Sequence, residues 1–332
     1  MSLKFSVVVP VYNRPDELEE LLKSIAAQTQ KPYEILVVED GSTISSERVV
    51  EAFQQRLPVQ YIFQENTGQG FARNTGYRHA TGDYFFVFDS DCVLPPDYFQ
   101  IVHDFLLKKP LDAFGGPDAA HPDFTVIQKA INHTMTSFFT TGGIRGGKKR
   151  VGAYHPRSFN MGISKKVFQA TDGYKIPFMG EDLEFSTRII KKGFTTGLIQ
   201  EAFVFHKRRT NLRQFVKQLF YFGRARINLS RFHPEQVKLI HLFPTVFSLG
   251  LLGAFICLFT LPKLGALVFS IFGIYFLALF LEGVWKYKSL TVALVSIVTT
   301  LLQMFGYGGG LVVESVRKWR GVDPNTPYID LY

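Results

Sequence analysis

Three long apolar segments near the C-terminus place the strongest limit on how this chain can fold. They run from 239 to 260, from 264 to 281 and from 289 to 313, and none contains Asp, Glu, Lys or Arg. A helix needs about 20 apolar residues to cross a hydrocarbon core of roughly 30 Å, so the second segment is marginal and the other two are long enough. The alternative is that the three segments are buried helices of a soluble protein, but such a protein would need a very large core to cover them. We therefore expect an integral membrane protein with a soluble N-terminal domain.

A basic segment precedes the apolar ones. Residues 206–234 carry eight Lys or Arg between His206 and Phe232, and apolar residues recur there with the spacing of one helix face. A basic amphipathic helix fits the surface of an anionic membrane. Nucleic acid would also suit the net charge of +9, but the helix leads straight into membrane segments, so we expect no nucleic-acid partner. The positive-inside rule then places the N-terminal domain in the cytoplasm, on a multi-pass protein of the inner, cytoplasmic membrane.

The third apolar segment leaves two arrangements open. Two spans would return the chain to the cytoplasm at WKYK, residues 285–288, whereas a third span would put RKWR, residues 317–320, outside. The sequence GYGGG at 306–310 would let the segment bend and return. We favour a bent or interfacial third segment, and expect a membrane domain over 235–332 with two or three hydrophobic helices.

The first 110 residues alternate between strand-like and helical patterns. Such alternation predicts an α/β fold with a mostly parallel sheet and helices on both faces. Ligands of such sheets bind beyond the carboxyl ends of the strands. Strands are expected at 5–11, 34–38, 60–63 and 84–88, and helices at 15–29, 45–55, 70–80 and 96–108. Three polar stretches should therefore share one rim: PVYNR at 10–14, EDGS at 39–42 and DSD at 89–91.

The carboxylates of this rim suggest a cation site. Strand alternation points Asp89 and Asp91 to the same side, where a hard divalent cation would offset their repulsion. The alternative is a capping aspartate and a turn aspartate before a Pro-Pro step. Elsewhere on the rim, Asp40 could accept a hydrogen bond from a base, Tyr12 could stack on that base, and Arg73 could contact phosphate.

Six segments, in this order and spacing, resemble glycosyltransferase family 2. They read VVVPVYNRPDELEELLKSIAAQT, ILVVEDGS, NTGQGFARNTG, FDSD, FNMGISKKVFQATDGY and GEDLEFSTRIIKKGF, and the match covers roughly residues 3–210. The resemblance implies a GT-A nucleotide-sugar-binding domain, with a Rossmann-like sheet, over residues 1–205, followed by C-terminal transmembrane helices. Two departures stand out: Glu39-Asp40 replaces a common pair of aspartates, and QLFYFGRAR is unlike the QxxRW motif of processive polysaccharide synthases.

The resemblance also implies a donor site and a metal site. In the donor site, Asp40 would contact the nucleotide base, with Pro10 and Tyr12 lining the pocket and Arg73 near the diphosphate. In the metal site, Asp91 would hold Mn²⁺ or Mg²⁺, Asp89 would contact ribose or the metal, and His206 would complete the shell. The alternative for His206 is a surface histidine beside the membrane.

On the acceptor side, the resemblance implies that Asp182 is the general base, with Glu181 beside it. The alternative for Asp182 is an ordinary acid at a helix N-terminus. Asn160 and Arg157 lie in a segment that would flank the acceptor. Basic residues in the same region could hold a lipid phosphate or form a plain solvated loop: Arg145, Lys148, Lys149, Arg150 and Arg157.

Three functions remain open. The first is inverting, metal-dependent transfer of a sugar, expected to be UDP-linked, to a hydroxyl of a lipid-linked or envelope glycan acceptor. The second is a polyprenyl-phosphate monoglycosyltransferase, whose phosphate acceptor needs no base. The third is a non-catalytic scaffold that binds nucleotide sugars, against which the intact Asp89, Asp91 and Asp182 count.

Overall fold

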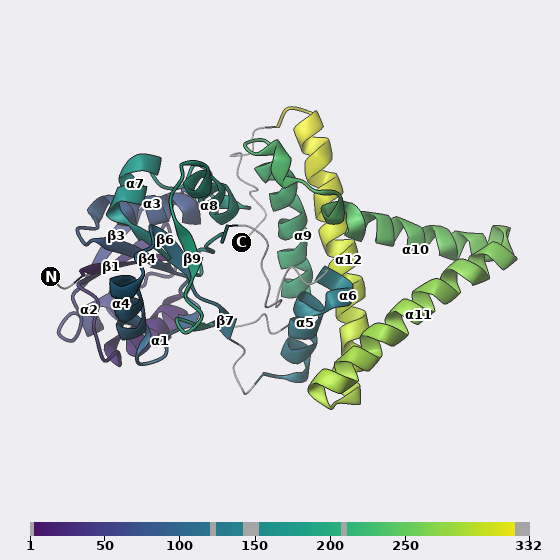
Figure 1. The fold of residues 1–332 in the computed structure, drawn as a ribbon, viewed down its shortest axis with the longest axis horizontal. Helices are drawn as coiled ribbons and strands as arrows, with labels where there is room; N and C mark the ends of the chain where they lie inside the picture. Colours follow the sequence, from purple (N-terminus) through teal and green to yellow (C-terminus); the bar gives the residue numbers. More distant parts are fainter. Residues whose placement is uncertain (1–2, 120–123, 142–152, 207–210, 323–332) are drawn as a thin grey trace. The chain divides into compact units, whose positions relative to one another are not determined.

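The computed structural model describes residues 3–119, 124–141, 153–206 and 211–322. The chain divides into two compact units. The sheet unit comprises residues 1–121 and 151–207, and the helical unit comprises residues 122–150 and 208–332 (Figure 1). The segment 122–150 lies between strands in the sequence and yet belongs to the helical unit, so the expected domain of residues 1–205 contains a piece that packs with the C-terminal helices.

The sheet unit is built on a seven-stranded sheet with the order β3-β2-β1-β4-β8-β6-β9. The first four strands are parallel, β8 is antiparallel to both neighbours, and β6 and β9 are parallel. This confirms the predicted mostly parallel sheet. The strands are β1 Phe5–Val11, β2 Glu34–Asp40, β3 Val59–Gln64, β4 Tyr84–Phe88, β6 Ala113–Gly115, β8 Asn160–Ser164 and β9 Thr196–Leu198.

The central strands are buried on both faces. In β1, Val7 and Val9 belong to one apolar cluster and Val8 to the other, because successive side chains point to opposite faces. A Cβ at Gly76 would lie 2.2 Å from Val8 Cγ1, so that glycine lets its helix press on the sheet. The helices of this unit are α1 Pro15–Ala26, α2 Glu47–Phe53, α3 Gln69–His79, α4 Tyr98–Lys108, α7 Lys165–Thr171 and α8 Glu181–Lys191.

A second, three-stranded sheet has the order β5-β10-β7. Its strands are β5 Cys92–Val93, β7 Asp118–Ala119 and β10 Val204–His206. The antiparallel register pairs His206 with Cys92, the residue that follows Asp91. This small sheet therefore brings the backbone of residue 206 to the end of the DSD sequence.

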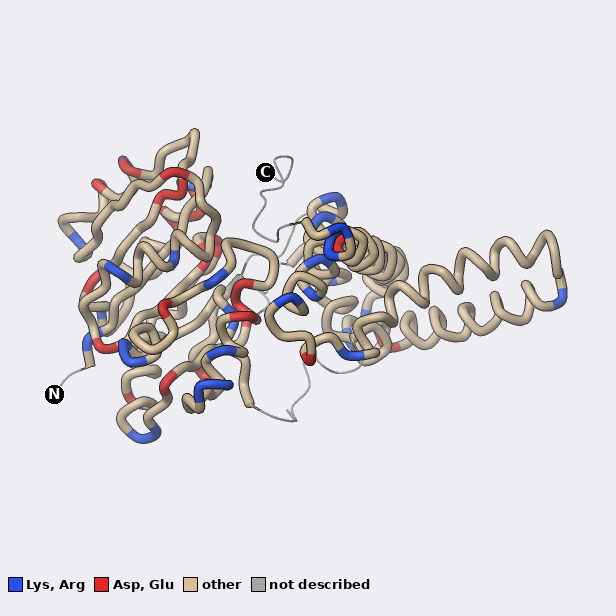
Figure 2. The backbone as a smooth tube through the Cα atoms, turned by 90° about the horizontal axis from the view of Figure 1, so that it is seen from above, with Lys and Arg blue, Asp and Glu red and all other residues tan. Residues whose placement is uncertain are grey.

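In the helical unit, three of the described helices are long and apolar enough to cross a membrane. Its elements are α5 Val126–Thr136, α6 Phe138–Thr141, α9 Leu212–Leu229, η1 Pro234–Gln236, η2 Leu239–Leu242, α10 Phe243–Thr260, α11 Pro262–Tyr287 and α12 Leu290–Trp319. Helices α10 and α11 form a hairpin that carries almost no charge along its length (Figure 2).

The sequence GYGGG does not interrupt the third segment for a bend and return at residues 306–310, because α12 is one continuous helix; the interfacial alternative stays a prediction. The glycines there serve close packing of α9 on α12. A Cβ at Gly310 would lie 2.0 Å from the carbonyl oxygen of Phe220, and one at Gly223 would lie 2.0 Å from the carbonyl oxygen of Tyr307. Small residues at a helix interface allow two backbones to approach in this way.

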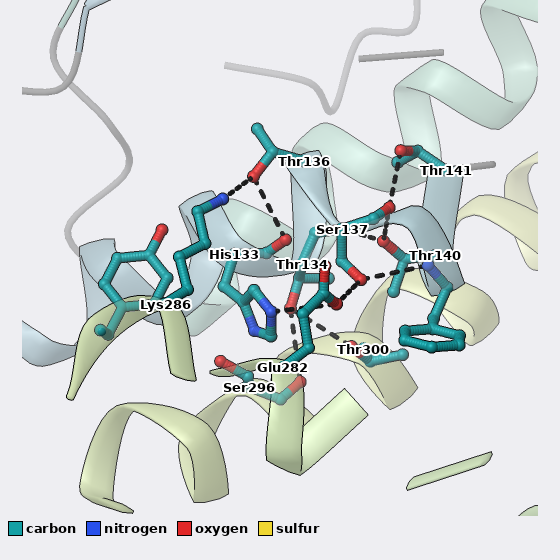
Figure 3. Close-up of polar contacts among 12 residues, drawn as sticks. His133, Thr134, Thr136, Ser137, Thr140, Thr141, Glu282, Lys286, Ser296 and Thr300 are labelled. Carbon is teal, nitrogen blue, oxygen red and sulfur yellow. Dashed lines mark hydrogen bonds and ion pairs between the residues drawn. The ribbon is translucent and has the colours of Figure 1, made fainter. Parts of the chain in front are cut away.

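Polar contacts fasten α5 and α6 to the C-terminal helices (Figure 3). The hydroxyl of Thr134 lies 2.7 Å from that of Thr299, and Ser137 donates a hydrogen bond to Glu282. Buried His133 lies with Nε2 3.3 Å from the same Glu282 carboxylate. Except for Glu282, which is 25% exposed, these polar side chains are buried, so their contacts offset the cost of removing them from water.

Candidate active site

The carboxyl ends of β1 and β2 are joined by Asn13. Its side-chain oxygen accepts hydrogen bonds from the backbone N–H groups of Thr43 at 2.8 Å and Ile44 at 2.9 Å. Asn13 adopts the left-handed backbone conformation, with φ 53°, which asparagine tolerates better than most residues. Pro10 is buried in β1 opposite Val38, and half-buried Tyr12 follows that strand. The two loops therefore form one edge of the sheet, as the sequence predicted.

The acidic pair at the end of β2 has two separate sets of contacts. Asp40, 3% exposed, accepts hydrogen bonds from the N–H groups of Thr67 and Gly68, both at 2.9 Å. It thereby holds the turn that opens α3. Fully buried Glu39 accepts from the N–H of Ser46 at 2.6 Å and so closes the loop before α2. The contact of Asp40 with a nucleotide base stays a prediction.

Arg73 links the end of β4 to the start of α8. The side chain is 1% exposed, with Nη2 2.8 Å from Asp89 and Nη1 3.0 Å from Glu181. The guanidinium also lies 5.4 Å from the ring of Tyr174. Burial alone would lower the pKa of Arg73, but nearby Asp89 and Glu181 raise it above its ordinary value. Arg73 is thus a fixed positive charge beside the DSD sequence.

Asp91 faces a different arginine. Its Oδ2 lies 3.4 Å from Nη1 of Arg14, and its side chain is 7% exposed, against 32% for Asp89. Arg14 also forms an ion pair with Glu17 at 2.9 Å. The sequence placed PVYNR on this rim, but gave no role to its arginine. Its position just beyond a strand end was the signal available.

The possible metal ligands at this rim are of the type that suits a hard divalent cation. Asp89 and Asp91 supply carboxylate oxygens, which such ions prefer, and the strand pairing brings the backbone of His206 beside Asp91. The side chain of His206 lies outside the described part of the structure. Among the side chains that are described, no group of three His, Cys, Asp or Glu residues has the spacing of a metal site.

Asp182 lies in the first turn of α8 and is paired with Arg157. The Nε of Arg157 is 2.8 Å from Oδ2 of Asp182, and the two side chains are 34% and 14% exposed. The preceding Gly180 has φ 99°, a conformation that favours glycine. An acid in this first turn is stabilised by the helix dipole, as the sequence predicted for GED.

Glu181 is the less accessible of the two acids. It is 4% exposed and accepts hydrogen bonds from Gln69 and Arg73. Burial raises the pKa of Glu181, and the guanidinium of Arg73 opposes that rise. Asp182 is the more exposed of the two carboxylates, and its role as a base stays a prediction.

Of the other residues predicted on the acceptor side, Asn160 is buried and four basic residues are not described by the structure. Asn160 is 1% exposed, accepts a hydrogen bond from the hydroxyl of Tyr98 and donates one to the carbonyl of Ala202 at 2.9 Å. Its side chain is engaged within the sheet unit, and a contact with an acceptor stays a prediction. Four of the predicted basic residues lie outside the described residues: Arg145, Lys148, Lys149 and Arg150.

The mostly parallel sheet, with carboxylates and arginines at its rim, has the architecture of the GT-A fold class. Residues 6–170 match the model of the family described as "Glycosyl transferase family 2". The chain belongs to glycosyltransferase family 2 through these residues.

Two curated relatives each match about a third of the chain. Glycosyltransferase GlyA of Streptococcus pneumoniae is 39% identical over 110 residues, which are 33% of this chain and 16% of that protein. The uncharacterized glycosyltransferase YibD of Escherichia coli is 33% identical over 110 residues, which are 33% of this chain and 32% of that protein. The chain therefore covers less than half of the length of these relatives.

One solved structure is similar over nearly the whole chain. It is the mannosyltransferase PcManGT from Pyrobaculum calidifontis, in complex with GDP-Man and Mn²⁺. The similarity covers 97% of this chain and 89% of that one, with a TM-score of 0.59 and 16% sequence identity. At this identity the likeness is one of fold.

Proposed function

We propose that this protein is a membrane-anchored, inverting glycosyltransferase. It transfers a sugar from a nucleotide diphosphate sugar, a UDP-sugar by expectation, to a hydroxyl of a lipid-linked or envelope glycan acceptor at the cytoplasmic face of the membrane. The observation that carries the proposal is Arg73, which joins the DSD sequence to the GED sequence of a family 2 domain through Asp89 and Glu181.

In this proposal, one set of rim residues binds the donor and its leaving diphosphate, and another activates the acceptor hydroxyl. Asp91, with Asp89 and His206, would hold Mn²⁺ or Mg²⁺, and such an ion neutralises the departing diphosphate. The Mn²⁺ and GDP-Man in the complex of PcManGT support this part. Asp40, Pro10 and Tyr12 would hold the base of the donor.

Asp182 accepts the proton of the acceptor hydroxyl. General base catalysis of this kind contributes typically about 10²–10⁴-fold to a rate. Attack on the anomeric carbon from the face opposite the diphosphate forms one bond as the other breaks, so the configuration inverts. Arg157, with its ion pair of 2.8 Å, fixes the direction in which the Asp182 carboxylate points.

The test compares Asp91→Ala and Asp182→Asn with the exposed control Asp104→Asn. Detergent-solubilised protein is given a panel of nucleotide sugars and native lipid extract. The release of nucleoside diphosphate and the mass of the product are measured. Transfer should be lost in both site variants, be unchanged in the control, and require added Mn²⁺ or Mg²⁺ in the wild type. Full activity of either site variant, or no release with any donor, would contradict the proposal.

A second candidate is transfer to a polyprenyl phosphate. It is favoured by Arg157, which leaves 34% of its side chain exposed beside Asp182 and could hold an acceptor phosphate. A phosphate acceptor is already ionised and needs no base. Activity of Asp182→Asn on polyprenyl phosphate, combined with loss of activity in Asp91→Ala, would favour this second reaction over the first.

A further inference from the structure

Helix α12 buries its polar face and exposes its apolar one. The buried side chains include Ser296, Thr299, Thr300, Gln303 and Glu314. The exposed large apolar side chains recur three, four or seven residues apart, which places them on one face: Leu290, Leu294, Val298, Phe305, Val312, Val316 and Trp319. A helix with this pattern needs apolar surroundings along one side over its whole length.

The α10–α11 hairpin meets α12 at two separated points. Near the start of α10, the hydroxyl of Thr245 donates to the carbonyl of Gly308 at 3.4 Å. Near the end of α11, a Cβ at Gly283 would lie 3.1 Å from the Cα of Ala293. At 1.5 Å per residue these contacts are about 22 Å apart along α12. Figure 1 shows α12 running across the open end of the hairpin.

This geometry fixes the direction of α12 relative to a membrane that the hairpin crosses. The two helices of a hairpin are antiparallel, so the start of α10 and the end of α11 lie at the same membrane surface. Since both of these ends touch α12, Gly308 and Ala293 lie at that surface too. A helix with two points so far apart at one depth runs along the surface.

The charges of α9 agree with this direction. Helix α9 runs parallel to α12, with Val216 near Gly306 and Arg224 bound to Glu314. The exposed Arg213 and Lys217 of α9 therefore lie beside the middle of α12. If α12 crossed the membrane, both charges would lie deep in hydrocarbon, where an unpaired Arg or Lys is strongly disfavoured.

We propose that α12 lies in the plane of the cytoplasmic membrane surface, with its apolar stripe in the acyl boundary, and that only the α10–α11 hairpin crosses. The lipid bilayer itself covers this apolar stripe. Exposed basic residues lie at both ends, Lys286 and Lys288 before the helix and Lys318 and Arg320 at its end, where anionic headgroups would attract them. The proposal rests on the membrane anchoring described above, but not on the transferase activity.

The test uses single cysteines in a Cys257→Ser background, in which the remaining Cys92 is buried. Lys288→Cys and Arg320→Cys mark the two ends of α12, and Lys263→Cys marks the tip of the hairpin. A membrane-impermeant maleimide is added to sealed inside-out vesicles. Both ends of α12 should be labelled from the same side as the sheet unit, and the tip only after the vesicles are permeabilised. Labelling of the two ends from opposite sides, or of the tip together with both ends, would overturn the proposal.

A depth measurement gives a second, independent readout. Nitroxide labels at Leu294→Cys, Phe305→Cys and Val316→Cys report their depth through collisions with oxygen and with a water-soluble nickel chelate. An in-plane helix gives three equal, shallow depths. A spanning helix gives a much deeper label at residue 305 than at the other two, which would contradict the proposal. Both readouts are independent of transfer, so an inactive enzyme could still confirm the topology.

Discussion

Arg157 and Asp182 form an ion pair, with 2.8 Å between Nε and Oδ2, at the start of α8. The pair orients the carboxylate that we propose as the base. We therefore expect Arg157→Ala to lower kcat by about 10- to 100-fold, since a displacement of about 1 Å can cost that much. Arg157→Lys keeps the charge and should retain more of the activity. Steady-state kinetics with donor and acceptor varied separately would check this, and an unchanged kcat in Arg157→Ala would contradict it.

Glu34 should make the sheet unit sensitive to acid. Burial alone would raise the pKa of Glu34, but hydrogen bonds from Ser6 and Thr81 outweigh it and lower that pKa below 4.5. The lowered pKa stabilises the fold above pH 4.5, and this contribution is lost as the pH falls through the folded-state value.

Glu34→Gln should therefore destabilise the protein at pH 7, by about 1–3 kcal/mol for the loss of bonds to a charged acceptor. The difference from the wild type should shrink below pH 4.5. Thermal unfolding of both detergent-solubilised proteins at neutral and acidic pH measures this difference in stability. A difference that stays constant across this range would show that the charge of Glu34 contributes nothing.

Two adjacent glycines of α12 offer a matched pair of substitutions. A Cβ at Gly310 would lie 2.0 Å from the Phe220 carbonyl, whereas one at Gly309 would meet nothing within 4 Å. Gly310→Ala should separate α9 from α12 and lower the free energy of unfolding by about 1–3 kcal/mol. Gly309→Ala should be neutral or stabilising, because alanine favours a helix by up to about 1 kcal/mol. Equal thermal midpoints for the two variants would refute the packing role.

The sequence predicted those features that are local or periodic. The apolar runs of β1, β2 and β4 were recognisable because strands buried on both faces are continuously apolar. The acids of GED and the left-handed Gly193 marked both ends of α8. The placement of Asp89, Asp91 and Asp182 in one unit followed from these elements and from the resemblance.

Features that depend on residues far apart in the chain could not be predicted from the sequence. Arg73 and Glu181 are far apart in the chain, and no local pattern selects that carboxylate over others. The strands β5, β7 and β10 have only two or three residues each, too few to show alternation. Glycines 68, 70 and 76 permit close contacts with Pro177, Ile176 and Val8, and no local pattern in the sequence reveals these contacts.

Glu314 should be the most sensitive polar residue of the helical unit. Its carboxylate is 4% exposed and lies 2.7 Å from Arg224, 3.1 Å from Arg231 and 3.5 Å from Arg317. Glu314→Gln removes the only charge that offsets the buried Arg224 among these contacts, and breaking a buried pair on one side costs about 3–5 kcal/mol. The exposed Glu235 provides the control, since Glu235→Gln should leave stability unchanged.

The double variant Arg224→Met/Glu314→Leu separates charge from packing. Replacing both members of a buried pair by apolar groups of similar volume is often neutral, so it should regain most of the stability that Glu314→Gln loses. Arg231 and Arg317, which are 14% and 23% exposed, can turn toward water once the carboxylate is gone. Thermal midpoints and monodispersity in detergent measure the series. If the double variant were as unstable as Glu314→Gln, the carboxylate would matter through its remaining arginines and not through Arg224.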